Sequence, residues 1–307
     1  MNRPAMNRTA AGIGFALITA VISGFAIFVN SYAVKEMTDA ALFTTLKNGA
    51  AAVVLIGLAL TVVRPVQVRT ISRRSWLGVA VVGLIGGSVP FLLFFTGLAM
   101  ASAPSAAFIH KTLFVWVALL AVPLLGERLG WIQLTALGGL LLGQLLITPP
   151  AGVSWGLGET MIAAATLFWA VEVVLARRLL ADVPAPVLGV GRLGIGLVVL
   201  VGYLAVTGRL PLIAELTVTQ WAWVALTGLI LAGYVGSWLA ALSRAPATVV
   251  TSVLVIGALI TATLDALVRG TLPATAQLAG YGLIAVALLL LAGAVEWRPR
   301  RLAAQAG

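Results

Sequence analysis

Long blocks of apolar residues, separated by short polar stretches, dominate the pattern along the chain. No charged residue occurs from Thr9 to Val34 or from Ser75 to His110. A hydrocarbon core of about 30 Å requires roughly 20 apolar residues of helix, and backbone polar groups in lipid must be satisfied internally. The blocks also lack the period-two alternation of a membrane barrel. The pattern therefore predicts an all-α, polytopic membrane protein.

Charged residues, prolines and turn residues divide the blocks into ten predicted transmembrane helices. The Ala103-Pro104 step divides the longest uncharged stretch, and Pro149-Pro150 separates the fifth span from the sixth. The predicted spans are 11–34, 40–63, 75–99, 104–126, 130–148, 155–178, 184–207, 218–242, 246–268 and 274–295. The remaining segments are an N-terminal cytoplasmic segment (1–10), a linker loop (149–154) and a basic cytoplasmic tail (296–307).

Composition and charge agree with a membrane location. Hydrophobic residues make up 61% of the chain and charged residues 9%, whereas soluble domains carry about 25% charged residues. The net charge of +10 raises the question of nucleic-acid binding. The basic residues flank apolar blocks and form no continuous basic face, so no nucleic-acid partner is expected.

The distribution of basic residues predicts the orientation, because ten spans place both termini on one side of the bilayer. The predicted loops on the opposite side hold Lys35, Arg209 and Arg269. The side of the termini holds 13 basic residues: Arg3, Arg8, Arg64, Arg69, Arg73, Arg74, Arg128, Arg177, Arg178, Arg244, Arg298, Arg300 and Arg301. Cytoplasmic loops carry the excess of Lys and Arg. We therefore expect both termini in the cytoplasm and a multi-pass protein of the inner (cytoplasmic) membrane.

The two halves of the chain resemble each other at a shift of about 145 residues. The aligned positions include Lys47 with Arg192, Trp76 with Trp221, and Ala103-Pro104 with Ala245-Pro246. Each half, 11–148 and 155–295, contains five predicted spans. An odd number of spans means that the second half enters the membrane from the other side. Inverted repeats with a binding site near the bilayer centre are a recurrent transporter design.

Two local sequences carry a resemblance to a known family. They are Pro123-Leu124-Leu125-Gly126-Glu127 at the end of the fourth span and the stretch from Ala33 to Asn48. With the ten spans and the repeat, they resemble the EamA-type drug/metabolite transporter superfamily. The resemblance implies transport without ATP, by export or in some members uptake, of amino acids, nucleotide-related metabolites or toxic organic compounds.

The chain departs from the family pattern in two places. The second half has Asp265 to Gly270 where the first half ends in Gly-Glu, and the first span reads Ile22-Ser23-Gly24-Phe25 where a tryptophan is usual. The resemblance therefore implies a family and not a substrate.

Ionisable residues inside spans are costly and are candidates for function. Glu172 lies in the sixth span and Arg192 in the seventh, at similar depths below the cytoplasmic side. Consecutive spans and matching depth predict that these two residues pair. The pair has two interpretations: a structural ion pair that fixes two helices, or a gate that responds to protons or substrate. Under the second, Glu172 is the candidate proton carrier for proton-coupled export.

Lys47 and Lys111 lie in the outer halves of the second and fourth spans, and His110 precedes Lys111. The acid nearest in depth is Asp265, which lies four residues before Arg269 and forms an ordinary helix pair with it. If Arg269 neutralises Asp265, the two lysines have no protein counter-ion. They then favour an anionic or zwitterionic substrate, with His110 as a further candidate contact. The alternative is that each lysine extends along its stem to the membrane interface.

Polar and aromatic residues in spans complete the predicted site. Asn30 and Trp169 are candidate substrate contacts, although a single Asn in a span is as often a helix–helix hydrogen bond. Gly139 and Gly143 form a small-xxx-small pattern that could join helices of one chain or two subunits of a homodimer. The Gly86-Gly87 pair before Pro90 favours a weakened third span or close packing.

The predicted function is a secondary transporter of small metabolites such as amino acids, and the family resemblance implies export. No cofactor or metal is expected, because the chain has no cysteine, a single histidine and no Walker motif. A membrane enzyme would require a cluster of catalytic side chains, which the sequence does not suggest. A channel would require a ring of like residues around a pore, and Lys47 with Arg192 supplies two positions of such a ring.

Overall fold

The computed structural model describes residues 3–148 and 155–305, and this part of the chain is helical. The helices of the first half are α1 (Arg3–Glu36), α2 (Ala40–Val62), α3 (Pro65–Arg69), α4 (Arg73–Gly87), α5 (Val89–Met100), α6 (Ala103–Lys111), α7 (Leu113–Leu125) and α8 (Trp131–Ile147). Those of the second half are α9 (Leu157–Leu179), α10 (Ala185–Val206), the 3-10 helix η2 (Leu210–Glu215), α11 (Val218–Leu242), α12 (Ala247–Val253), α13 (Ile256–Val268) and α14 (Thr275–Gln305).

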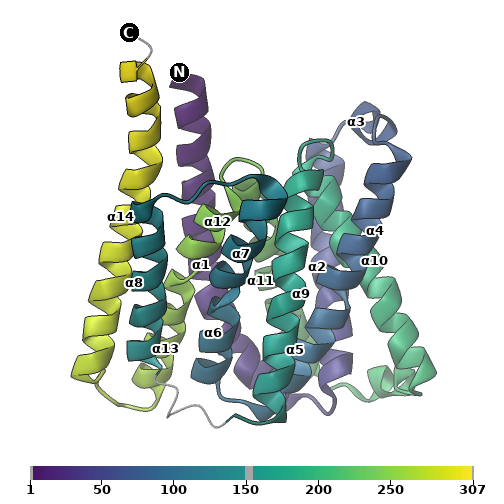
Figure 1. Cartoon of the computed structure of the whole chain (residues 1–307). Coiled ribbons are helices and arrows are strands. Elements are labelled where there is room, and N and C mark those ends of the chain that lie inside the picture. Colours follow the sequence, from purple (N-terminus) through teal and green to yellow (C-terminus); the bar gives the residue numbers. More distant parts are fainter. Residues whose placement is uncertain (1–2, 149–154, 306–307) are drawn as a thin grey trace.

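The helices reproduce the predicted spans. Within the described residues, nine helical segments are long and apolar enough to cross a membrane, and α8 is a shorter apolar helix. Its 17 residues extend about 25 Å at 1.5 Å per residue, and α8 lies along α14 in the bundle (Figure 1). Counting α8, the polytopic fold with ten spans is confirmed. The predicted linker 149–154 lies outside the described residues.

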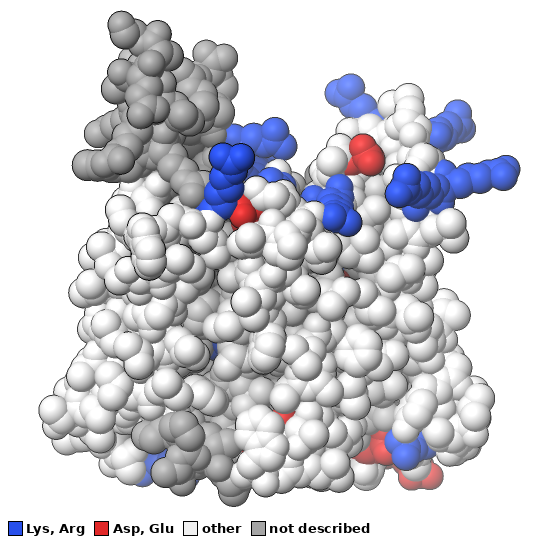
Figure 2. Space-filling view, viewed as in Figure 1, with Lys and Arg blue, Asp and Glu red and all other residues white. Residues whose placement is uncertain are grey.

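The two ends of the chain lie at the same end of the bundle (Figure 1). We call this end the terminal face, and it also carries α3. The other end, the opposite face, carries η2 and the connection from α13 to α14 (Figure 1). Helix α1 begins at the terminal face, whereas α9, the first helix of the second half, begins at the opposite face. Lys and Arg side chains gather at the terminal face, and uncharged residues cover the middle of the molecule (Figure 2).

Three spans are interrupted near their centres. The third span divides into α4 and α5 at Ser88, whose φ of −131° and ψ of −77° are not helical. The fourth divides at Thr112, and the ninth at Leu254-Val255. Pro90 follows the break at Ser88, and proline has no N–H to donate to the preceding turn. The Gly86-Gly87-Pro90 sequence therefore interrupts its span, as one interpretation of the sequence expected.

Helices α8 and α14 pack through small residues. A Cβ atom added to Gly143 would lie 2.6 Å from Ile284, and one added to Gly280 would lie 2.7 Å from the Gly143 carbonyl oxygen. Gly139 faces Ala287 in the same way. Small residues let helix backbones approach closely in membranes. The predicted small-xxx-small pattern thus joins two helices of one chain, one from each half.

Candidate functional site

A cavity lies between the two halves of the bundle, near mid-depth. Its lining includes six residues with polar or charged side chains: Ser23, Asn30, Lys47, His110, Glu172 and Arg192. The rest of the lining is apolar or aromatic, including Trp169 and Tyr234. The cavity has a volume of about 80 Å³, which is room for a small number of water molecules at about 30 Å³ each. A metabolite therefore needs the walls to move apart.

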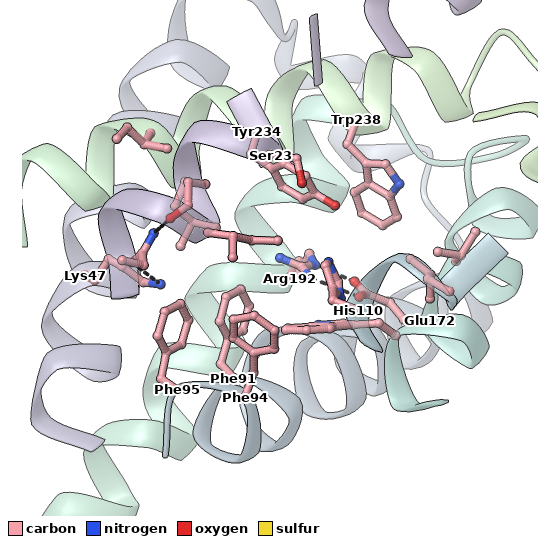
Figure 3. Close-up of a pocket in the computed structure, with 18 residues that line it drawn as sticks. Ser23, Lys47, Phe91, Phe94, Phe95, His110, Glu172, Arg192, Tyr234 and Trp238 are labelled. Atoms are coloured by element: carbon pink, nitrogen blue, oxygen red, sulfur yellow. Dashed lines mark hydrogen bonds and ion pairs between the residues drawn. The ribbon is translucent and has the colours of Figure 1, made fainter. Parts of the chain in front are cut away.

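Glu172 and Arg192 form a buried, bidentate ion pair at one end of this cavity (Figure 3). Arg192 Nε donates to Glu172 Oε1, and Arg192 Nη2 donates to Oε2 at 3.0 Å. The guanidinium also lies 5.2 Å from the centre of the Phe91 ring and 5.5 Å from that of Trp238. Arg192 Nη1 is buried without a hydrogen-bond partner. The pairing predicted from depth is therefore present, and it leaves one donor of Arg192 unused.

Lys47 and Asn30 form the polar group at the other end of the cavity (Figure 3). Lys47 Nζ donates to Asn30 Oδ1 at a long 3.4 Å and lies 3.2 Å from the centre of the Phe95 ring. The side chain is 1% exposed, so it does not extend to the membrane interface. No ion pair among the described residues includes Lys47, and Arg269 pairs with Asp265 at 2.8 Å. The Lys47 amine lies among aromatic rings and one amide oxygen, contacts that suit a basic group.

The residues before the break at Ser88 contact the side chains around the ion pair. Pro90 has no N–H, so the carbonyl of Gly86 lacks its normal helical donor. Trp169 Nε1 donates to this carbonyl at 3.1 Å, and Asn48 Nδ2 donates to the Gly87 carbonyl at 3.2 Å. A Cβ atom on Gly86 would overlap the Glu172 carboxylate. Trp169 therefore lines the cavity and also fixes the broken span against α9.

His110 and Lys111 are neighbours in sequence but face different surroundings. His110 lines the cavity, with its ring centre 5.0 Å from Trp169 and 5.4 Å from Phe94, and its Nδ1 has no hydrogen-bond partner. Lys111 is 3% exposed and donates to Ser23 Oγ at 2.5 Å. Lys111 does not line the cavity itself. The structure therefore brings together six of the seven predicted site residues and places Lys111 behind Ser23.

Sequence reasoning did not select several residues of the cavity wall. Phe91, Phe94 and Phe95 follow Pro90 and form one wall, with Tyr234 and Trp238 of α11 across the cavity (Figure 3). The spacing of the phenylalanines, three and four residues apart, places them on one helix face. That spacing was the available signal, but it is equally typical of ordinary helix packing.

Metal-binding side chains are not grouped at this site. Within residues 3–148 and 155–305, no group of three or more His, Cys, Asp or Glu side chains could hold a metal ion.

Comparison with known proteins identifies the class of protein that this fold and cavity define. The model of the EamA-like transporter family matches residues 10–148 and again residues 156–293. Two matches of this kind cover nearly the whole chain, one in each half. The chain belongs to the EamA-like transporter family, and it is a multi-pass membrane transporter.

Solved structures agree with the fold. One, described only as "Crystal structure of protein", is 19% identical and superimposes with a TM-score of 0.66, covering 89% of this chain and 97% of the other. At that identity the likeness concerns the fold alone. No curated protein matches the sequence.

Proposed function

We propose that the chain is a secondary transporter of small organic anions or zwitterions with an apolar body, such as amino acids and related compounds. The observation that carries the proposal is the composition of the cavity between the halves: an aromatic wall with a lysine at one end that has no ion-pair partner among the described residues. Within the part of the chain that the structure describes, Lys47 has an amide and aromatic rings as partners and no acid. A carboxylate on the substrate would supply the missing counter-charge, because buried charges are stable when they are paired.

The rest of the cavity suits the remainder of such a molecule. Phe91, Phe94 and Trp169 offer apolar and aromatic surface, and small-molecule sites are mostly apolar with a few placed polar groups. The unused Nη1 of Arg192 and Nδ1 of His110 add two groups that a polar ligand atom could satisfy. These orphaned atoms favour a polar ligand, since unsatisfied buried groups are costly.

Alternating access accounts for the small volume of the cavity. A space of about 80 Å³ corresponds to a contracted site that a change in the relative position of the halves would widen toward one face at a time. The excess of basic residues on the terminal face favours a cytoplasmic location for that face, in the inner membrane. Export is the expected direction on the basis of the family resemblance, and a gradient rather than ATP would drive it.

Ligand screening tests the substrate class. Purified protein is melted in detergent in the presence of amino acids, nucleosides and organic cations, because a ligand of the folded state raises its apparent stability. We expect carboxylate-bearing ligands with apolar bodies to stabilise the protein. Lys47→Met, which removes the ammonium and retains an apolar stem, should lose that response. If organic cations raise the melting temperature, and do so equally in Lys47→Met, the proposal of an anionic or zwitterionic substrate is wrong.

Transport in liposomes tests the mechanism and the role of Glu172. A carrier shows saturable flux and counter-transport, whereas a channel shows neither, so counterflow of the best ligand distinguishes the two. If Glu172 carries the coupled proton, Glu172→Gln should abolish the dependence of flux on a pH gradient while exchange persists. An unchanged dependence would restrict the Glu172–Arg192 pair to a structural role.

A further inference from the structure

A second hollow, distinct from the central cavity, lies at the terminal face between the two halves. It has a volume of about 680 Å³, within the range of about 300 to 1,000 Å³ of small-molecule sites. Its walls come from the start of α1, the end of α7, the end of α9 and the junction of α11 with α12. Four arginines line it: Arg8, Arg177, Arg178 and Arg244.

The four arginines are held by backbone carbonyls and not by acids of the described residues. None of them takes part in the ion pairs of the described residues. They donate instead to backbone carbonyls at helix ends: Arg177 to Leu242 at 2.8 Å, Arg244 to Ala240 at 2.7 Å, Arg8 to Ser243 at 3.3 Å, and Arg178 to Leu124. These bonds fix the guanidinium groups around the hollow and leave their full positive charges in place.

The one acid in the lining, Glu127, is already engaged. Its Oε1 accepts from the Ala247 N–H at 2.6 Å. Its Oε2 accepts from the Thr248 N–H at 3.2 Å and from the Thr248 hydroxyl at 2.6 Å. Glu127 thus caps the start of α12 across the two halves. It lowers the local positive charge without forming an ion pair with any of the arginines.

We propose that this hollow binds the phosphoryl group of an anionic ligand. Arginine suits phosphate because its planar, multiple N–H donors match the phosphate oxygens. Basic pockets between transmembrane helices, at the depth of the lipid headgroups, are suited to anionic phospholipids. The same chemistry would accept a free phosphate or a soluble phosphate ester. Topology alone requires arginines on this face, but it does not require four of them around one hollow whose single lining acid, Glu127, is bonded to the start of α12.

Binding there would act on both halves of the transporter. Arg8 belongs to the first half, and Arg177, Arg178 and Arg244 belong to the second. An anion held by Arg8 together with the arginines of the second half opposes separation of the halves at the terminal face. The site is independent of the proposed substrate, because it shares no lining residue with the central cavity.

Two matched double variants test the proposal. R8Q/R178Q removes two exposed cations from the hollow, and R69Q/R73Q removes two exposed cations from the same face at α3 and α4. Each protein, as the full chain in neutral detergent, is melted during titration with phosphatidylglycerol, phosphatidylcholine, sodium phosphate, or sodium chloride at equal ionic strength. The single variant Arg178→Gln serves as a milder change if the double variant folds poorly.

We expect phosphatidylglycerol to raise the melting temperature of the wild type and of R69Q/R73Q at similar concentrations. R8Q/R178Q should need about tenfold more, as the loss of charge-assisted hydrogen bonds predicts, and Arg178→Gln should shift in the same direction. A matching response to sodium phosphate identifies a soluble ligand, and a response to the lipid alone identifies a headgroup. Equal losses in both double variants, or no stabilisation of the wild type by either phosphate source, would overturn the proposal.

Discussion

Lys47 and Arg192 occupy equivalent positions in the two halves, yet their partners differ in charge. Arg192 of α10 is held by the carboxylate of Glu172, which lies in the first span of its half. Lys47 of α2 is held by the amide oxygen of Asn30, which lies in the first span of the other half. One end of the cavity, the balanced end, therefore pairs its basic side chain with a carboxylate. The other, the unbalanced end, has a basic side chain without an acidic partner among the described residues. The difference shows how two similar halves can contribute unlike partners to one binding site.

Removal of the acid from the balanced end should have the largest effect. Glu172→Met leaves the Arg192 guanidinium buried without a counter-ion, and breaking such a pair costs about 3 to 5 kcal/mol. A much lower melting temperature in detergent is expected. The double variant Glu172→Met/Arg192→Met should recover most of the loss, because apolar residues of similar size often replace a buried pair without penalty. A double variant as unstable as the single one would contradict this explanation.

Addition of an acid to the unbalanced end should make the two ends alike. Asn30→Asp gives Lys47 a counter-ion, so an anionic ligand gains nothing by approaching it. We expect the affinity for carboxylate ligands to fall about 100-fold, or roughly 2.7 kcal/mol, measured by titration of the melting temperature or by calorimetry. Lys47→Met should lose affinity as well. Retained affinity in Asn30→Asp would show that the ligand does not use Lys47.

A larger side chain at Gly86 tests the contact between Gly86 and Glu172. Gly86→Ala places a methyl group against the carboxylate, and overpacking of this kind costs about 1 to 3 kcal/mol. Gly57→Ala is the matched control, because a Cβ atom at Gly57 meets nothing within 4 Å. Thermal melts of both variants should differ clearly. Similar melts would mean that the third span adapts without disturbing the ion pair.

The smallest expected effect comes from one hydrogen bond. Trp169→Phe keeps an aromatic ring in the cavity but removes the donor to the Gly86 carbonyl, at a cost of about 0.5 to 1.5 kcal/mol. The comparison is Trp116→Phe, whose exposed indole bonds to Thr112 of the same span. Chemical denaturation should rank Trp169→Phe below Trp116→Phe. The reverse order would argue against a bracing role for Trp169.

The spans and the ion pair follow from the sequence because both depend on local pattern and depth. Apolar blocks and positions such as Ala103-Pro104 define the helices, and consecutive spans bring Glu172 to Arg192. The position of Lys111 does not follow, because the rotation of a broken span decides whether His110 or Lys111 faces the cavity. The bond from Glu127 to Ala247 also escapes prediction, since it joins residues 120 positions apart through tertiary packing alone.

The close contact of Gly143 with Gly280 has a consequence for how the chain is assembled. Helix α8 ends the first half, whereas α14 follows the other described helices in the chain. Before α14 is in place, the glycine face of α8 has no helix packed against it. This short helix then exposes that face to lipid. Insertion of α14 supplies the backbone that fits against Gly143. A chain that stopped short of Thr275 would leave α8 without this partner helix.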